Sequence, residues 1–84
     1  MAKITLYTTM FCPYCIRAKK LLKSKGQEFE EIDVGEHPRE RAVMMERAHG
    51  ARTVPQIFIG DKHVGGCDDL YALEREGKLD PLLA

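Results

Sequence analysis

The chain has 84 residues, of which 44% are hydrophobic and 31% are charged, and its formal net charge at pH 7 is zero. This balance predicts one globular domain over residues 1–84 and argues against a disordered chain. The absence of net positive charge gives no indication of binding to nucleic acid or to an anionic membrane. No apolar run is long enough for a signal peptide or a membrane span, so we expect a cytoplasmic protein, and we expect it to be a monomer.

The first predicted elements are a strand over residues 3–8 and a helix over residues 13–25, which Gly26 ends. The motif Cys12-Pro13-Tyr14-Cys15 stands between them. Pro13 suits the first helical position, because it has no N–H group and its φ angle is already helical. In a cytoplasmic protein such a pair of cysteines is more often catalytic than a structural disulfide.

Cys12 and Cys15 are expected to differ in role. At the helix N-cap, the sulfur of Cys12 lies against free backbone N–H groups, whose dipoles favour the thiolate over the thiol. Cys15 lies one turn further on the same side, with the apolar residues Ala18, Leu21 and Leu22, and should be the more buried. This pattern predicts that Cys12 is the attacking thiol and Cys15 the resolving thiol, which closes an intramolecular disulfide.

The remaining elements are short and follow each other without a linker or an internal repeat. They are predicted as a strand at 29–34, a helix at 38–50, a hairpin of strands at 56–59 and 63–64, and a helix at 67–77.

Apolar residues mark the buried faces of the later helices. Ala42, Met45 and Ala48 are spaced for one face of the second helix, and Leu70 and Leu73 for the inner face of the third. At the end of the chain, Asp80-Pro81 is typical of the N-cap and first position of a short helical turn.

The order β-α-β-α-β-β-α predicts an α/β fold. Its β-α-β start implies parallel strands with a right-handed crossover, and the later hairpin adds an antiparallel pair. We therefore expect a four-stranded mixed sheet flanked by helices, and the strand that leads into C-x-x-C and a helix favours a thioredoxin-like fold.

Thr53-Val54-Pro55 precedes the third predicted strand. A cis Val54–Pro55 bond would leave the backbone N–H and C=O of Val54 pointing outward, free to pair with an extended peptide. The alternative is an ordinary trans proline at a strand start, which the local sequence favours because cis bonds are uncommon.

Gly65-Gly66-Cys67-Asp68-Asp69 forms a second predicted helix start. The glycines allow a ligand close approach, the N–H groups of Cys67 and Asp68 suit a carboxylate, and the Asp68 side chain suits an ammonium group. Such a site fits the end of a γ-glutamyl group. The alternative is simple capping of the helix by Asp68 or Asp69.

Two structural alternatives apply to the cysteines. Cys12, Cys15 and Cys67 together with His63 have the residue types of a zinc site, although this pair opens a helix whereas structural zinc pairs usually lie on turns. Cys12 and Cys15 are also of the type that packs in a core without any reaction.

The three motifs together resemble the dithiol glutaredoxins of the thioredoxin superfamily, and in particular the bacterial glutaredoxin 3 type. The resemblance covers essentially the whole chain, as one glutaredoxin domain, and the spacing between the motifs matches that family. It implies that Pro55 is cis, which reverses the local preference for trans.

The resemblance implies a glutathione-dependent thiol–disulfide oxidoreductase. Its substrates would be glutathionylated proteins and protein disulfides, with ribonucleotide reductase among the partners, and glutathione would be the reductant with no metal required. Cys12 would be the nucleophile, and Cys12 and Cys15 would form the redox-active disulfide. The residues implied in glutathione binding are Cys12, Tyr14, Thr53, Val54, Pro55, Gly66, Cys67 and Asp68.

One position departs from the family. Many members carry a lysine three residues before the first cysteine, where it pairs with the glycine carboxylate of glutathione, and this chain has Thr9 there. Arg39 and Arg41 lie in the segment where a second basic residue is common, but Ala42 occupies the matching position.

Other classes of function remain as alternatives. Some glutaredoxins carry an iron–sulfur cluster, mainly those with a C-G-F-S motif in place of Cys12-Pro13-Tyr14-Cys15. A redoxin that is reduced by thioredoxin reductase is a second alternative, against which the segment around Cys67 argues. A zinc or redox-sensing binding module, with Cys67 as the sensing thiol, is the third.

Overall fold

The computed structural model describes residues 3–84 and contains the predicted elements in the predicted order. The strands and helices are β1 (Ile4–Thr8), α1 (Pro13–Ser24), β2 (Glu30–Asp33), α2 (Pro38–Arg47), β3 (Gln56–Ile59), β4 (Lys62–Gly65), α3 (Cys67–Arg75) and α4 (Leu79–Leu83).

The four strands form one mixed sheet in the order β2-β1-β3-β4. β1 and β2 are parallel, with Thr5 opposite Glu30, whereas β3 is antiparallel to both β1 and β4. The β3–β4 register shifts between Ile57 and Phe58, as in a β-bulge. The predicted mixed sheet is therefore confirmed.

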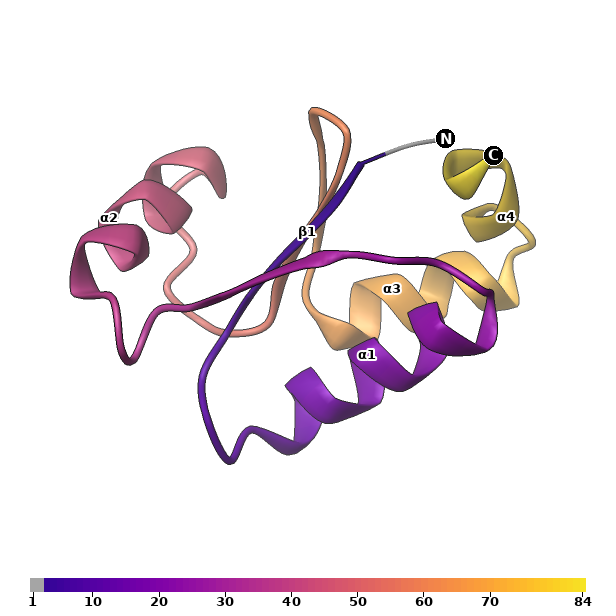
Figure 1. The fold of residues 1–84 in the computed structure, drawn as a ribbon. Helices are drawn as coiled ribbons and strands as arrows, with labels where there is room; N and C mark the ends of the chain where they lie inside the picture. Colours follow the sequence, from indigo (N-terminus) through magenta and orange to yellow (C-terminus); the bar gives the residue numbers. More distant parts are fainter. Residues whose placement is uncertain (1–2) are drawn as a thin grey trace.

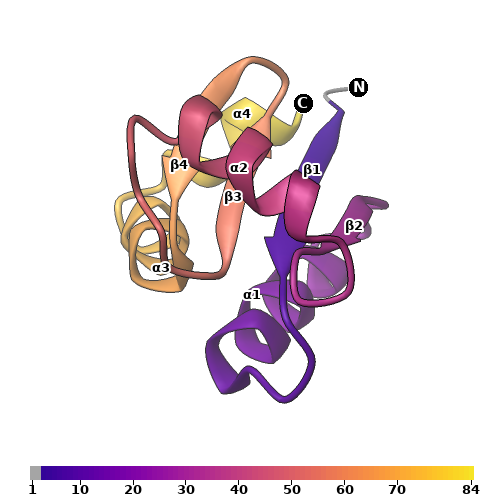
Figure 2. The same ribbon diagram turned by 90° about the vertical axis from the view of Figure 1, so that its left-hand side faces the viewer.

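Helices cover the sheet on both faces. Figure 1 shows α1 and α3 side by side on one face and α2 on the other, and Figure 2 presents the α2 face to the viewer. The side chains of β1 alternate between these layers: Ile4 and Leu6 pack with α1, α3 and α4, whereas Tyr7 packs with α2. All five residues of β1 are buried, because this central strand has a helical layer on each face.

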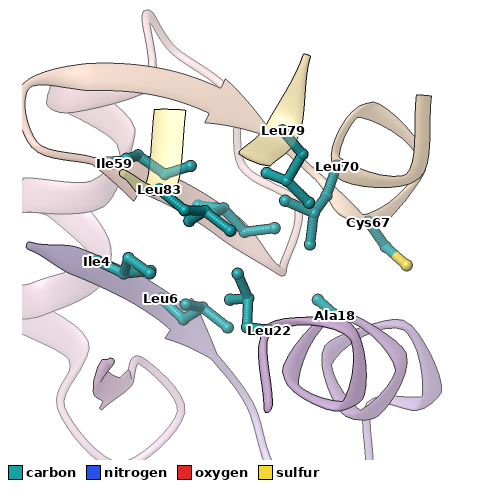
Figure 3. Packing of buried hydrophobic residues seen from close by; sticks show 10 residues of the cluster. Ile4, Leu6, Ala18, Leu22, Ile59, Cys67, Leu70, Leu79 and Leu83 are labelled. Atoms are coloured by element: carbon teal, nitrogen blue, oxygen red, sulfur yellow. The ribbon is translucent and has the colours of Figure 1, made fainter. Parts of the chain in front are cut away.

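The larger core lies between the sheet and the layer of α1, α3 and α4 (Figure 3). Its buried members are Ile4, Leu6, Ala18, Leu22, Ile57, Ile59, Cys67, Leu70, Leu79 and Leu83. Cys67 lies at the margin of this core, where α3 approaches α1. Burial of the first turn of α3 therefore holds the start of that helix beside the start of α1.

The smaller core, under α2, corrects one prediction. Met44 is the buried residue of α2 and Ala48, its C-cap, is also buried, whereas Met45 is only half-buried and Ala42 is exposed. Met44 and Ala48 lie one turn apart, so both reach Tyr7 and Phe58 on the sheet. The adjacent methionines allowed two apolar faces, and tertiary packing selected the one with Met44.

Helix ends differ modestly from the predicted ones. α2 ends at Arg47 and not at Gly50, because His49 and Gly50 both adopt positive φ angles, of 57° and 92°. The last helix begins at Leu79 with Lys78 as its N-cap, so the predicted cap at Asp80 is wrong. Burial of Leu79 and Leu83 one turn apart starts this helix earlier than the local capping pattern indicated.

Within residues 3–84, none of the helices has the length and apolarity that crossing a membrane would require.

Candidate active site

Cys12 is the N-cap of α1, as predicted. Its backbone is extended, with φ −99° and ψ 109°, and Pro13 follows in the first turn. The Sγ atom accepts a hydrogen bond from the backbone N–H of Cys15 at 3.2 Å. This bond and the positive end of the helix dipole both favour negative charge on the sulfur. The half-buried Cys12 is therefore the thiol of the pair that is placed to meet an incoming disulfide.

Cys15 has the opposite environment. Its side chain is 1% exposed, and burial raises the pKa of its thiol to about 12, with further upward contributions from the hydrogen bond and charge of Cys12. A thiol with this pKa is almost fully protonated at neutral pH. Cys15 is therefore a poor nucleophile toward an incoming disulfide. Cys15 lies one helical turn from Cys12, so it can attack a disulfide formed on Cys12 without being exposed to solvent.

The Val54–Pro55 peptide bond is cis. The isomer implied by the family resemblance is therefore confirmed, and the trans isomer favoured by local sequence is wrong. Tertiary context decides the isomer of an ordered X–Pro bond, and Pro55 is buried here with its carbonyl oxygen facing Gly66. The Val54 carbonyl oxygen lies 4.0 Å from the Sγ atom of Cys12, so this segment borders the reactive thiol.

A cleft of about 370 Å³ opens between the cis-proline segment and the start of α3. Seven of the eight residues implied in glutathione binding line it, and the eighth, Cys12, lies at its edge beside Val54. The predicted lining residues are Tyr14, Thr53, Val54, Pro55, Gly66, Cys67 and Asp68, and those not predicted are Ala51, Gln56, Gly65 and Asp69. The structure thus brings together three motifs that are separated by up to more than half of the chain.

Gln56 stabilises the wall of the cleft that contains Thr53. Its Nε2 atom donates to the Thr53 carbonyl at 2.9 Å and to Thr53 Oγ1 at 3.3 Å, while its Oε1 atom lies 2.7 Å from Nε2 of His63. An amide oxygen can only accept, so His63 carries its proton on Nε2. Burial, together with the charge of His49, lowers the pKa of His63 and favours this neutral donor. Both polar ends of the buried Gln56 amide are therefore satisfied.

The opposite wall is the start of α3. Asp69 Oδ2 accepts a hydrogen bond from the N–H of Gly66 at 3.0 Å, so Asp69 provides the capping interaction predicted for this pair of aspartates. Asp68 is exposed and lines the cleft. Cys67 is buried, and burial together with the negative charge of Asp68 raises the pKa of its thiol.

The structure does not assemble the alternative zinc site. His63 is hydrogen-bonded to Gln56 and stacked on Phe58, with ring centroids 4.9 Å apart. Over residues 3–84, no group of three or more metal-binding side chains is close enough to hold an ion. Cys12, Cys15 and Cys67 all carry free thiols.

Thr9 stands where many glutaredoxins have a lysine, so the positions of other basic groups near the cleft matter. Thr9 is outside the lining of the cleft, close to Gly35. Arg41 extends from α2, and its Nη1 atom donates to the Arg52 carbonyl at 2.9 Å, next to the Thr53 wall. Arg41 does not line the cleft itself, but this hydrogen bond holds its guanidinium next to a residue of the cleft wall.

Comparisons with known proteins agree with this geometry. The Glutaredoxin family model matches residues 4–64. The chain is 58% identical to a glutaredoxin of Pseudomonas aeruginosa, over 100% of this chain and 99% of that one. It is 54% identical to glutaredoxin 3 of Escherichia coli over 83 residues, which are 99% of each chain.

A solved structure extends the match to the fold. The complex of buckwheat glutaredoxin with glutathione is 35% identical in sequence, with a TM-score of 0.88, over 98% of this chain and 76% of that one. The predicted thioredoxin-like fold is confirmed, as is the resemblance to glutaredoxins.

Proposed function

The chain belongs to the glutaredoxin family of thiol–disulfide oxidoreductases, and we propose that it uses glutathione to reduce glutathione mixed disulfides and protein disulfides. The observation that supports this most strongly is the position of the Cys12 thiol. It caps α1 and lies 4.0 Å from the Val54 carbonyl at the edge of the cleft.

We propose one orientation for glutathione in the cleft. Its cysteinyl unit pairs with the backbone of Val54, which directs the glutathione sulfur toward Cys12. The γ-glutamyl carboxylate takes the free N–H groups at the start of α3, and its ammonium group takes the Asp68 carboxylate. Tyr14 covers the groove from the side of α1. Binding of glutathione by the buckwheat relative is consistent with this orientation.

The one-thiol route needs Cys12 alone. Its thiolate attacks the glutathione sulfur of a mixed disulfide, the Cys12–glutathione bond forms, and the departing protein sulfur takes a proton from solvent. A second glutathione thiolate then attacks the glutathione bound to Cys12. This step releases glutathione disulfide and returns Cys12 as a thiolate. Both glutathione sulfurs end in one disulfide, and the protein thiol carries the two electrons.

The two-thiol route adds Cys15. Cys12 attacks a protein disulfide and forms a mixed disulfide with it. Cys15 then loses its proton and attacks the Cys12 sulfur, which releases the second protein thiol and leaves a Cys12–Cys15 disulfide. Two glutathione molecules reduce this disulfide. We propose disulfide-containing proteins such as ribonucleotide reductase as partners for this route, in the cytoplasm and with the chain acting as a monomeric single domain.

The test compares two serine variants in a glutathione-coupled assay on a small glutathione mixed disulfide. Cys12→Ser should lose at least about a thousandfold in kcat/KM, because the attacking thiolate is gone. Cys15→Ser should keep activity within about threefold of the wild type, because the one-thiol route does not use it.

Cys67→Ser is the matched control, since it replaces the third thiol at the wall of the cleft. Substantial activity in Cys12→Ser would refute the proposal. Equal loss in both Cys12→Ser and Cys15→Ser would exclude the one-thiol route.

A further inference from the structure

Exposed apolar side chains gather around Cys12. Met10 is 62% exposed, Phe11 91%, Tyr14 53% and Ile16 50%. These four are among the five large hydrophobic residues that are exposed within residues 3–84, and all lie within four positions of the reactive thiol. We call Met10, Phe11, Tyr14 and Ile16 the apolar collar. Scattered exposed hydrophobic residues are ordinary, but such clustering beside one thiol indicates a binding surface.

Phe11 is not only exposed but also has an unfavourable backbone conformation. Its φ angle is 61°, in the left-handed region that bulky residues rarely adopt. Strain of this kind collects at functional sites, where the surrounding structure maintains it. The ring is 91% exposed, so packing inside the fold does not offset the strain. A contact between this ring and another molecule would offset the strain.

Glutathione does not account for this collar. Of its four residues only Tyr14 lines the cleft, and Met10, Phe11 and Ile16 lie outside it. Three of the four collar residues therefore lie near the thiol but outside the proposed glutathione site. Molecules that meet Cys12 and extend beyond the cleft are the polypeptide substrates.

Positive charge on α1 next to the collar indicates which charge the partner carries. The α1 sequence contains Arg17, Lys19, Lys20 and Lys23 and has no acidic residue. Lys20 is exposed one turn after Ile16, on the same side of the helix. Lys19 is instead paired with Glu31 at 3.0 Å. An acidic residue in the partner, beyond its apolar side chain, would meet this basic surface.

We propose that the apolar collar docks the polypeptide part of protein disulfide substrates, with Phe11 as its anchor. The preferred substrate has a large apolar side chain next to its disulfide and an acidic residue beyond it. This inference rests on the proposed function, because the docked disulfide must reach the Cys12 thiolate. The reaction is reduction of one substrate disulfide to two thiols, with two glutathione molecules oxidised to glutathione disulfide.

The test uses two synthetic peptides, each with one internal disulfide and one glutamate, which differ by Phe or Ser next to a cysteine. Glutathione is kept reduced by glutathione reductase and NADPH. We expect the wild type to prefer the Phe peptide by about tenfold in kcat/KM, which is the order expected from burying one aromatic side chain. Phe11→Ser should reduce this preference to about twofold or less while leaving the rate on a small glutathione mixed disulfide unchanged.

Two further variants keep the result interpretable. Val43→Ser removes the fifth exposed apolar side chain, which is 42% exposed and lies on α2 on the other face of the sheet, and should keep the full preference for the Phe peptide. Phe11→Gly suits the φ angle of 61° and so retains the fold, but it should lose the preference just as Phe11→Ser does.

An unchanged peptide preference in both Phe11 variants would overturn the docking proposal, as would loss of the preference in Val43→Ser. Equal loss of rate on all substrates would also overturn it, because Phe11 would then only support the geometry of Cys12. Failure of the proposed function would appear separately, as activity that survives Cys12→Ser.

Discussion

Cys12 and Cys15 lie one helical turn apart and yet differ in almost every physical property. Cys12 is half-buried and its sulfur accepts an N–H bond at 3.2 Å, whereas Cys15 is buried and its thiol pKa is raised to about 12. Part of that rise comes from Cys12 itself, through a hydrogen bond and its charge. Once Cys12 is in a mixed disulfide, these contributions disappear. The order of attack, Cys12 first and Cys15 second, therefore follows from the two environments.

Arg41 is the residue through which we expect this chain to replace the missing lysine at Thr9. Its guanidinium donates to the Arg52 carbonyl at 2.9 Å, beside the Thr53 wall of the cleft. We propose that the glycine end of glutathione binds at this wall. Arg41→Ala should raise the KM for glutathione by about threefold to tenfold with little change in kcat. Thr9→Lys should lower this KM, because it adds a cation near the carboxylate. Steady-state kinetics with varied glutathione measure both effects.

Arg39→Ala is the matched control for Arg41, since it removes an exposed arginine from the same helix. Screening makes the effect of a distant surface charge small, so this variant should behave like the wild type. If Arg39→Ala and Arg41→Ala raise the KM equally, general positive potential and not a local contact holds the carboxylate. An unchanged KM in Thr9→Lys would show that position 9 lies too far from the ligand.

At the scale of elements, the turn between β4 and α3 is the most constrained part of the site. Gly65 has a φ angle of +115°, which residues with a side chain rarely adopt, and a Cβ atom there would overlap the Asp69 carboxylate. That carboxylate caps α3 through the Gly66 N–H. Gly65→Ala should therefore lower the free energy of unfolding by about 2–3 kcal/mol, through backbone strain and loss of the cap. Urea denaturation measures this loss.

Gly66→Ala provides the neighbouring comparison. Gly66 has an ordinary φ angle of −94°, and a Cβ atom there would meet only the Pro55 carbonyl oxygen at 3.5 Å, a normal contact. This variant should change stability by less than about 1 kcal/mol. Equal destabilisation by the two substitutions would mean that steric crowding in this turn, and not the backbone conformation of Gly65, causes the loss of stability.

Sequence patterns predicted the elements well because each element has its own local signal. Cys12-Pro13 marks the start of α1, Gly26 its end, and the Cys67-Asp68-Asp69 segment the start of α3. Local signals failed where tertiary packing decides between two similar choices, as for the buried face of α2 and the isomer of Pro55. Gln56 was missed as part of the site because its role depends on His63, a partner across the β3–β4 hairpin.

At the scale of the molecule, the layer of α1, α3 and α4 holds the two helix starts of the site together. The larger core fixes these helices against the sheet, and Lys25 at the end of α1 pairs with Glu74 of α3 at 2.7 Å and with Asp80 of α4 at 3.0 Å. Ion pairs at the surface contribute little energy, so the core supplies most of this stability. The two helix starts of the site thus belong to the layer that packs on the larger core.

The raised pKa of Cys15 should also be visible in the stability of the whole reduced protein. The folded chain holds the Cys15 proton up to a pH of about 12, whereas the unfolded chain releases it at the ordinary value of about 9.0. The unfolded state therefore binds fewer protons between these values, and the free energy of unfolding falls as pH rises through this window. Serine does not titrate there, so Cys15→Ser lacks this contribution.

The comparison is between chemical denaturation of the reduced wild type and of Cys15→Ser at about pH 8 and about pH 10.5. The wild type should lose about 1–2 kcal/mol more than the variant, since each pH unit within the window costs up to about 1.4 kcal/mol. Lysines, tyrosines and Cys67 also titrate at high pH, but they are present in both proteins and cancel in the difference. Parallel losses in the two proteins would mean that the buried environment of Cys15 does not oppose its ionisation, and the order of attack would need another cause.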